Sequence, residues 1–276
     1  MIADLQAQIE AIYADPSAVR DERTLGVLAK FRQALARGEI RAAELNGETW
    51  SCNVWVRKGL ALCIRFGRLS RSLAGSSIDL DTLPVRQFTL DDRIRVTGPT
   101  CFVRDSACVS PGCTLMPHSV IQAGAYIGAD TIVDVGVGIG TCAQIGARVH
   151  LNAGVQIQGQ LNPLDALPVI VGDSVSVGAN CVIGAGVIIS AGAVIFPGTI
   201  LSRQTRLYDP LRKQRCVPGT STPLIVPPDA IVMPGTRVVA PAQAPDFSVA
   251  IQVAIIAGYT NESELPAILI DRLLEN

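Results

Sequence analysis

The sequence of 276 residues is poor in aromatic residues and in histidine, and it has no excess of charge of either sign. Phe, Tyr and Trp make up 4% of the chain, and the formal net charge is −1. A net charge this close to zero argues against a nucleic-acid-binding surface, so we expect no nucleic-acid partner. The two histidines, His118 and His150, cannot form a three-histidine zinc site within one chain, and we expect no bound metal.

Long apolar runs and closely paired cysteines are also missing. We find no uncharged apolar stretch of about 18 residues, which predicts that the chain does not span a membrane. The first ten residues carry acidic side chains and no basic, apolar leader, so we expect no signal peptide. The eight cysteines form no Cys-x-x-Cys pair, and several occupy the repeat positions described next. This usage favours reduced thiols in a cytoplasmic protein over disulfides.

What the sequence does have is an aliphatic residue at every sixth position over most of its length. The longest run consists of Val103, Val109, Leu115, Ile121, Ile127, Val133, Ile139, Ile145, Leu151 and Ile157. The spacing resumes from Val171 to Leu201 and returns at Val226, Val232 and Val238. An α-helix repeats about every 3.6 residues and a half-buried strand about every 2, so neither explains it. The spacing predicts a mainly β fold, a parallel β-helix with three short strands in each triangular coil.

Outside the repeats, the composition predicts a cap at each end of the β-helix. We expect three regions: a small N-terminal α/β cap over 1–95, the β-helix over 96–243 and a short β-rich segment over 244–276. Apolar residues at helical spacing predict helices over 2–12 and 25–35, and the stretch 49–66 has a strand-like composition. Both ends need cover because an open β-helix end exposes unpaired backbone groups.

Two loops are expected where the repeats are interrupted, over 158–170 and 202–225. Loops that leave a regular solenoid commonly carry function. The second loop contains five cations and one acid, Asp209: the cations are Arg203, Arg206, Arg212, Lys213 and Arg215. This cluster suits a phosphate-bearing ligand such as coenzyme A, and a solvated basic loop is the equal alternative.

An ordered series of motifs also resembles a known family. The motifs are WSCNVWVRKGLALCIRF (50–66), IRVTGP (94–99), FVR (102–104), LMP (115–117), GAY (124–126), TIVD (131–134), TCAQIGARVHL (141–151), NPLDALPVIVGD (162–173) and TRLYD (205–209). Together they resemble the tetrahydrodipicolinate N-succinyltransferases, acyl-CoA-dependent enzymes of lysine synthesis. The resemblance implies a left-handed β-helix, a homotrimer with active sites between neighbouring prisms, and acetyl-CoA or succinyl-CoA as co-substrate.

The resemblance also implies roles for particular residues. The family's substrate-binding arginine matches Arg95, and its catalytic aspartate, which also contacts the substrate, matches Asp134. We expect Arg104 as a second substrate cation, and Arg206, Lys213 and Arg203 at the acyl-CoA. A solvated turn acid is the alternative for Asp134, and a surface ion-pair residue is the alternative for Arg95. His150 is the next candidate base.

The chain departs from the family at one motif. Where the family reads GARSE, this chain reads GANCV (178–182), so that Asn180 replaces an arginine and Val182 replaces a glutamate with a suggested catalytic role. These changes favour a specialised relative, such as an acyltransferase of tabtoxin biosynthesis, that acts on tetrahydrodipicolinate or a related amino acid. A catalytically inactive trimeric scaffold of the same fold is the alternative. Asn180 favours an uncharged acyl group, and the donor stays open between acetyl and succinyl.

Overall fold

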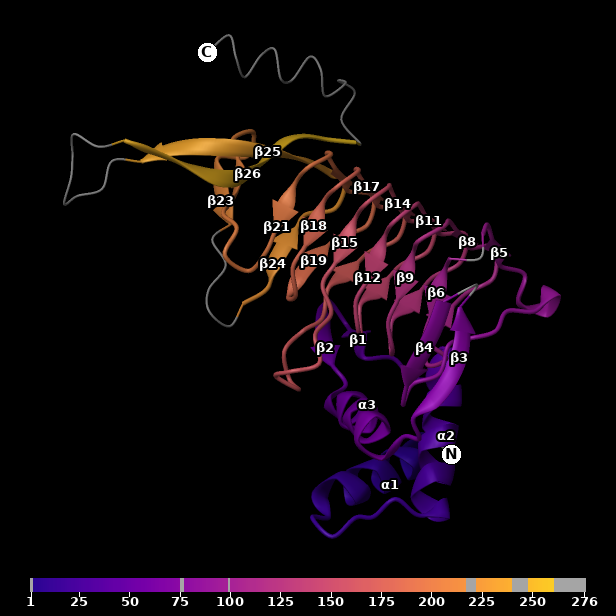
Figure 1. The fold of residues 1–276 in the computed structure, drawn as a ribbon. Coiled ribbons are helices and arrows are strands. Elements are labelled where there is room, and N and C mark those ends of the chain that lie inside the picture. Colours follow the sequence, from indigo (N-terminus) through magenta and orange to yellow (C-terminus); the bar gives the residue numbers. More distant parts are fainter. Residues whose placement is uncertain (1, 75–76, 99, 217–221, 240–247, 261–276) are drawn as a thin grey trace.

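The computed structural model describes residues 2–74, 77–98, 100–216, 222–239 and 248–260. It shows an elongated prism with a helical cap at one end and a smaller β-rich extension at the other (Figure 1). The fold is a left-handed parallel β-helix with an N-terminal α/β cap and a C-terminal β-rich segment, which confirms the predicted fold class.

Three sheets form the walls of the prism, and each successive coil adds one strand to each wall. The β6 sheet consists of β6 (Phe102–Val103), β9 (Val120–Ile121), β12 (Gly138–Ile139), β15 (Gln156–Ile157), β18 (Val182–Ile183) and β21 (Ile200–Leu201). The β7 sheet consists of β7 (Cys108–Val109), β10 (Tyr126–Ile127), β13 (Gln144–Ile145), β16 (Ile170–Val171), β19 (Val187–Ile189) and β24 (Leu224–Val226).

The third wall belongs to a ten-stranded sheet that continues beyond the prism. In spatial order its strands are β5 (Arg95–Val96), β8 (Thr114–Leu115), β11 (Ile132–Val133), β14 (His150–Leu151), β17 (Ser176–Val177), β20 (Val194–Ile195), β25 (Ala230–Val239), β26 (Val249–Tyr259), β22 (Leu207–Asp209) and β23 (Gln214–Cys216). The strands from β5 to β25 are parallel, whereas β26 is antiparallel to β25 and β23 is antiparallel to β22.

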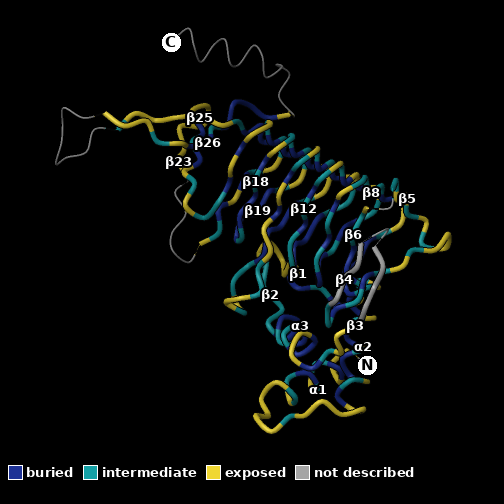
Figure 2. The backbone as a smooth tube through the Cα atoms, viewed as in Figure 1, coloured by how far each residue is buried: buried dark blue, intermediate teal, exposed yellow. Residues whose placement is uncertain are grey.

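The predicted aliphatic positions line the interior of the prism, and buried, dark-blue segments recur from coil to coil along the prism in Figure 2. Val133, for example, is fully buried and pairs with Leu115 on one side and Leu151 on the other. The predicted core is confirmed from Val103 to Leu201. The prediction for Val238 is wrong, because β25 leaves the coil to pair with β26 and Val238 is 67% exposed.

The cap contains α1 (Ile2–Ala14), α2 (Glu22–Ala36) and α3 (Val54–Phe66), with the short hairpins β1 (Ala43–Asn46)–β2 (Thr49–Cys52) and β3 (Ser70–Ala74)–β4 (Ser77–Asp81) and the 3-10 turn η1 (Leu90–Asp92). The helices predicted over 2–12 and 25–35 are confirmed. The strand-like interpretation of 49–66 is wrong beyond Cys52, because the rest of the stretch is α3. This helix is buried on most sides, and such a helix has a continuous apolar run like that of a buried strand.

The first interruption, between β15 and β16, folds back against the cap. The Arg57 guanidinium of α3 donates to the Pro163 carbonyl over 2.8 Å, and the Cys52 thiol donates to the Leu164 carbonyl over 3.4 Å. Arg57 itself is fully buried. This loop therefore holds the cap to the prism. Among the helices of the described ranges, none is long and apolar enough to cross a membrane.

The second interruption, expected as one loop over 202–225, forms the hairpin β22–β23 in its described part. Leu207 and Tyr208 of this hairpin pair with Ala254 and Ile255 of β26, which makes the hairpin the outer edge of the ten-stranded sheet. The basic residues of the loop are thus attached to the wall of the prism that carries Arg95 and the strand before Asp134.

Candidate active site

Arg95 and Asp134 lie on the outer face of the ten-stranded sheet. Arg95 pairs with Thr114, which pairs with Ile132, two residues before Asp134. Successive strands are about 4.8 Å apart, so two strand spacings, about 10 Å, separate the backbones of Arg95 and Ile132. Arg95 is exposed, and Asp134 is half-buried. The structure therefore places Arg95 and the strand before Asp134 in the same sheet, two strands apart.

The Asp134 carboxylate is held by its own turn. Its Oδ1 accepts a hydrogen bond from the Val135 backbone N–H over 2.7 Å, and the Asp134 backbone N–H donates to the Leu151 carbonyl over 3.0 Å. One carboxylate oxygen is therefore oriented by the backbone. The other oxygen can contact a ligand.

The next coil places His150 and Asn152 beside Asp134. His150 pairs with Ile132, and Asn152 occupies the position after Leu151 that Asp134 occupies after Val133. The Asn152 Nδ2 donates to the Val177 carbonyl over 2.8 Å, which fixes the orientation of its amide. Asn152 was not predicted from the sequence. The pattern that could have indicated it is its position, which is equivalent to that of Asp134 in the next coil.

Arg104 takes a position different from the one expected of a second substrate cation. Its side chain is 9% exposed, forms an ion pair with Asp81 at 2.7 Å, and donates to the Leu83 carbonyl over 2.6 Å. These partners belong to the cap, and Arg104 follows a strand of the β6 sheet. Arg104 therefore joins the first coil to the cap, and we leave it out of the proposed site.

A groove of about 660 Å³ lies on the outer part of the ten-stranded sheet, over β22, β25 and β26. Its walls combine cations with an aromatic ring and an apolar floor: Tyr208, Pro210, Lys213, Arg215, Arg237, Val253 and Ile255 are among them. Arg237 Nη1 donates to the Tyr208 hydroxyl over 2.7 Å. This hydrogen bond lowers the pKa of Tyr208, and Arg206 contributes in the same direction.

The one acid of the basic hairpin, Asp209, is also among the residues that line this groove, but its carboxylate has partners of its own. Asp209 is 3% exposed, accepts from the Tyr259 hydroxyl over 2.6 Å and accepts from the Arg212 backbone N–H over 3.0 Å. The Arg212 guanidinium stacks on the Tyr259 ring at 3.7 Å. Asp209 and Arg212 therefore anchor the hairpin turn to β26, and Lys213, Arg215 and Arg237 remain at the groove.

Arg203 is not brought to the groove. Its guanidinium packs on a corner of the prism, where a Cβ added at Gly186 would lie 2.0 Å from the Arg203 Nε. Of the three cations predicted to meet acyl-CoA, Lys213 lines the groove and Arg206 reaches Tyr208 at its edge. Arg237 was missed, because only the pairing of β25 with β26, and of β26 with β22, brings it to the hairpin.

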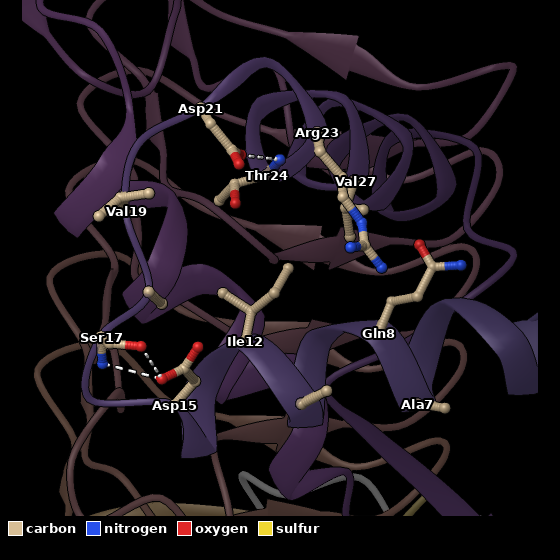
Figure 3. Close-up of a pocket in the computed structure, with 12 residues that line it drawn as sticks. Ala7, Gln8, Ile12, Asp15, Ser17, Val19, Asp21, Arg23, Thr24 and Val27 are labelled. Atoms are coloured by element: carbon tan, nitrogen blue, oxygen red, sulfur yellow. Dashed lines mark hydrogen bonds between the residues drawn. The ribbon is translucent and has the colours of Figure 1, made fainter.

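A different pocket, of about 460 Å³, lies in the cap between α1 and α2 (Figure 3). Its polar groups already serve local structure: Asp21 caps α2 by accepting from the Thr24 N–H over 2.7 Å, and Asp15 accepts from the Ser17 N–H and hydroxyl. The pocket lies far along the chain from Asp134 and includes none of the predicted site residues. We do not assign it to catalysis.

The buried thiols do not supply a nucleophile. Burial raises the pKa of Cys63 and of Cys142 to about 12, so both are protonated at neutral pH. Seven cysteines, those whose side chains the structure describes, are free: Cys52, Cys63, Cys101, Cys108, Cys113, Cys142 and Cys181. A reaction at Asp134 would therefore proceed without a thiol intermediate on Cys142, the cysteine of the same coil.

Comparison with known proteins supports the family that the motifs suggested. A family model described as the N-terminal domain of tetrahydrodipicolinate N-succinyltransferase matches residues 4–66. The 2,3,4,5-tetrahydropyridine-2,6-dicarboxylate N-succinyltransferase of Idiomarina loihiensis is 36% identical over 205 residues, which cover 72% of each chain. The chain belongs to the tetrahydrodipicolinate N-succinyltransferase family.

Relatives within the family align with this chain over different shares of its length. The enzyme of the same name from Methylorubrum extorquens is 36% identical over 185 residues, 63% of this chain. The chain spans 66% of the length of that relative and 65% of the length of the Methylorubrum populi relative. A solved maltose O-acetyltransferase from Clostridium difficile overlaps with a TM-score of 0.32 at 16% identity, covering 84% of this chain and 89% of its own.

The family's glutamate position, Val182, lies on a different wall from Asp134. Val182 belongs to the β6 sheet, half-buried between Gln156 and Ile200. Asn180, at the family's arginine position, has φ +57°, and its side chain lies over Gly154. Asn tolerates this left-handed conformation better than most residues, so Asn180 serves the corner of the coil.

Proposed function

We propose that the protein is an acyl-CoA-dependent N-acyltransferase that acts on the amine of tetrahydrodipicolinate or a related amino-dicarboxylate. The observation that carries the proposal is that one sheet presents Arg95, Asp134 and the cationic groove. From β11 to the part of β25 that pairs with β20 the sheet has four strand spacings, about 19 Å, and Arg237 lies five residues, about 17 Å, further along β25. A long ligand with phosphates at one end and a reactive thioester at the other suits this separation (Figure 1).

The proposed reaction uses Asp134 as the proton acceptor. The amine nitrogen attacks the thioester carbonyl carbon, the C–N bond forms, and the C–S bond breaks. The nitrogen loses a proton to the Asp134 carboxylate, and coenzyme A leaves as a thiolate that then takes up a proton. Arg95 pairs with a carboxylate of the acceptor, since a guanidinium binds carboxylates in bidentate geometry. Asn152 lies where its amide can orient the amine or the carbonyl.

We propose that the active form is a homotrimer. Val182 lies on the β6 sheet, whereas Asp134 follows a strand of the ten-stranded sheet, and a neighbouring prism that packs on the corner between these two walls would close the site. Apolar side chains on these walls and the corner between them favour such packing: Ile132, Val135 and Ile200 are 42%, 40% and 45% exposed. Sedimentation equilibrium at micromolar concentration should give three times the chain mass of 29.1 kDa. A stable monomer would contradict a site shared between subunits.

A finer proposal is that the protein is a specialised relative, as in tabtoxin biosynthesis. Val182 supports it, because a valine cannot perform the proton transfer of the family's glutamate. The alternative, a catalytically inactive scaffold of the same fold, is supported only by this same Val182. A thiol-release assay with acetyl-CoA and succinyl-CoA, each against tetrahydrodipicolinate and related amino acids, separates these proposals. Thiol release that depends on the acceptor supports the enzyme, and none with any pair supports the scaffold.

The groove gives a prediction for coenzyme A binding. The double variant Lys213→Ala/Arg237→Ala should weaken coenzyme A binding about 30- to 1000-fold, because each charge-assisted contact to a phosphate contributes about 1–2 kcal/mol. Isothermal titration calorimetry measures the change. Arg148→Ala is the matched control, since Arg148 is an exposed cation on the prism and does not line the groove. Unchanged affinity in the double variant would make the hairpin a solvated basic loop.

A further inference from the structure

A second hollow, of about 280 Å³, lies on the β6 sheet. It is lined by Val120, Gln122, Gly138, Gln156 and His118, among others. Along this wall Val120, Gly138 and Gln156 are neighbours on successive strands. A Cβ added at Gly138 would lie 2.4 Å from the Gln156 Oε1, so the space above Gly138 is bounded by the amide of the next strand.

The hollow begins at the corner that Asp134 occupies. Gly136 is one of its lining residues and follows Asp134 by two positions. Two residues span at most about 7 Å of chain, so the hollow starts within that distance of the Asp134 backbone. If Asp134 takes the proton of the attacking amine, the thioester carbon under attack lies close to this carboxylate. The acyl chain attached to that carbon would then lie beside the hollow.

The walls of the hollow offer amide groups and apolar surface. The Gln156 Nε2 donates to the Gly136 carbonyl over 3.1 Å, which holds its amide at the edge of the hollow. Val182 follows Gln156 on the next strand. No lysine, arginine, aspartate or glutamate is among the residues that line the hollow, and His118 is exposed. A carboxylate placed here would lose its bound water without gaining an ion pair with a fixed cation. A methyl group has no such hydration to lose.

We propose that this hollow receives the acyl chain of the thioester and selects uncharged chains over carboxylate-bearing ones. The proposal rests on the proposed acyltransferase function. It makes Gly138 and Gln156 determinants of donor specificity. In this proposal Asp134 still accepts the proton of the amine, and the cationic groove still binds the phosphates of coenzyme A.

Butyryl-CoA and succinyl-CoA test the charge selection, because the two acyl chains have nearly the same length and differ by a terminal methyl or carboxylate. Thiol release is measured at pH 8 for both thioesters. We expect kcat/KM for butyryl-CoA to exceed that for succinyl-CoA at least about tenfold. Equal values, or a preference for succinyl-CoA, would overturn the proposal.

The variant Gly138→Val tests the location. Strand β12 accepts a β-branched residue, and the contact to be displaced is the mobile end of Gln156, so the variant should fold. We expect kcat/KM for butyryl-CoA to fall at least about tenfold and that for acetyl-CoA by no more than about threefold, because one added methylene already changes such ratios by about 10-fold or more. Gly26→Val, in open space on α2, is the matched control.

A binding measurement separates this proposal from the proposed function. Titration calorimetry compares coenzyme A with a non-cleavable butyryl thioether of coenzyme A. The wild-type protein should bind the thioether more tightly than coenzyme A, and Gly138→Val should lose that gain. If neither molecule binds, the acyl-CoA function itself fails. If both bind and the gain survives in the variant, the hollow is not the acyl site.

Discussion

Asp134→Asn should lower kcat/KM by about 10²–10⁴ with the best acyl-CoA and acceptor found, the usual contribution of a general acid or base. The substitution removes the proton-accepting oxygen and preserves the size of the side chain. Its remaining carbonyl oxygen can still accept from the Val135 N–H, so the turn should keep its conformation. The free energy of unfolding should change by no more than about 0.5 kcal/mol, because the side chain is not part of the core.

Steady-state kinetics and chemical denaturation on the same preparation check both parts of this expectation. Asp165→Asn is the matched control, since it neutralises an exposed carboxylate in the loop between β15 and β16. It should leave kcat/KM unchanged. Full activity of Asp134→Asn would remove Asp134 from proton transfer, and His150 on the neighbouring strand would be the next base to substitute.

Leu151→Ala should destabilise the protein by about 2–5 kcal/mol. Leu151 is fully buried on β14, where it packs between Val133 and Val177 in the aliphatic ladder of the ten-stranded sheet. Removing its branched end leaves a cavity, because the backbone pairing above and below prevents the coils from closing on it. Chemical denaturation with two spectroscopic probes gives the free energy of unfolding.

Ile225→Ala provides the comparison for that substitution. Ile225 lies on the outer side of the β7 sheet and is 48% exposed, so its loss should cost less than about 1 kcal/mol. If Leu151→Ala were as mild as Ile225→Ala, the aliphatic ladder would not be the main source of stability. The β-helix would then depend more on its backbone hydrogen bonds and its caps.

The sequence predicted the repeating part of the fold well, because one geometric rule repeats there. An aliphatic residue at each sixth position was enough to place residues from Val103 to Leu201 in the core. The rule fails where chain segments pair over long distances. Val238 leaves the coil because β26 offers it an antiparallel partner, and no local pattern around Val238 reports that partner.

The same division applies to the candidate site. Asn152 could have been found from Asp134 by adding one coil, since both follow a core aliphatic residue of the ten-stranded sheet. Arg237 could not, because it reaches Tyr208 through strands that are separate in the sequence. The position of Arg104 depended on Asp81 and Leu83, and nothing in the sequence indicates that the cap would bring these two to it.

The spacing of the coils makes this protein a molecular ruler. Because the strand before Asp134 and the strand that carries Arg237 belong to one sheet, the distance between them is a whole number of strand spacings. Deleting or inserting one coil would shift that distance in steps of about 4.8 Å and nothing smaller. Evolution can thus alter loops and side chains freely at either end, whereas the length of ligand that the surface accommodates changes only in discrete increments.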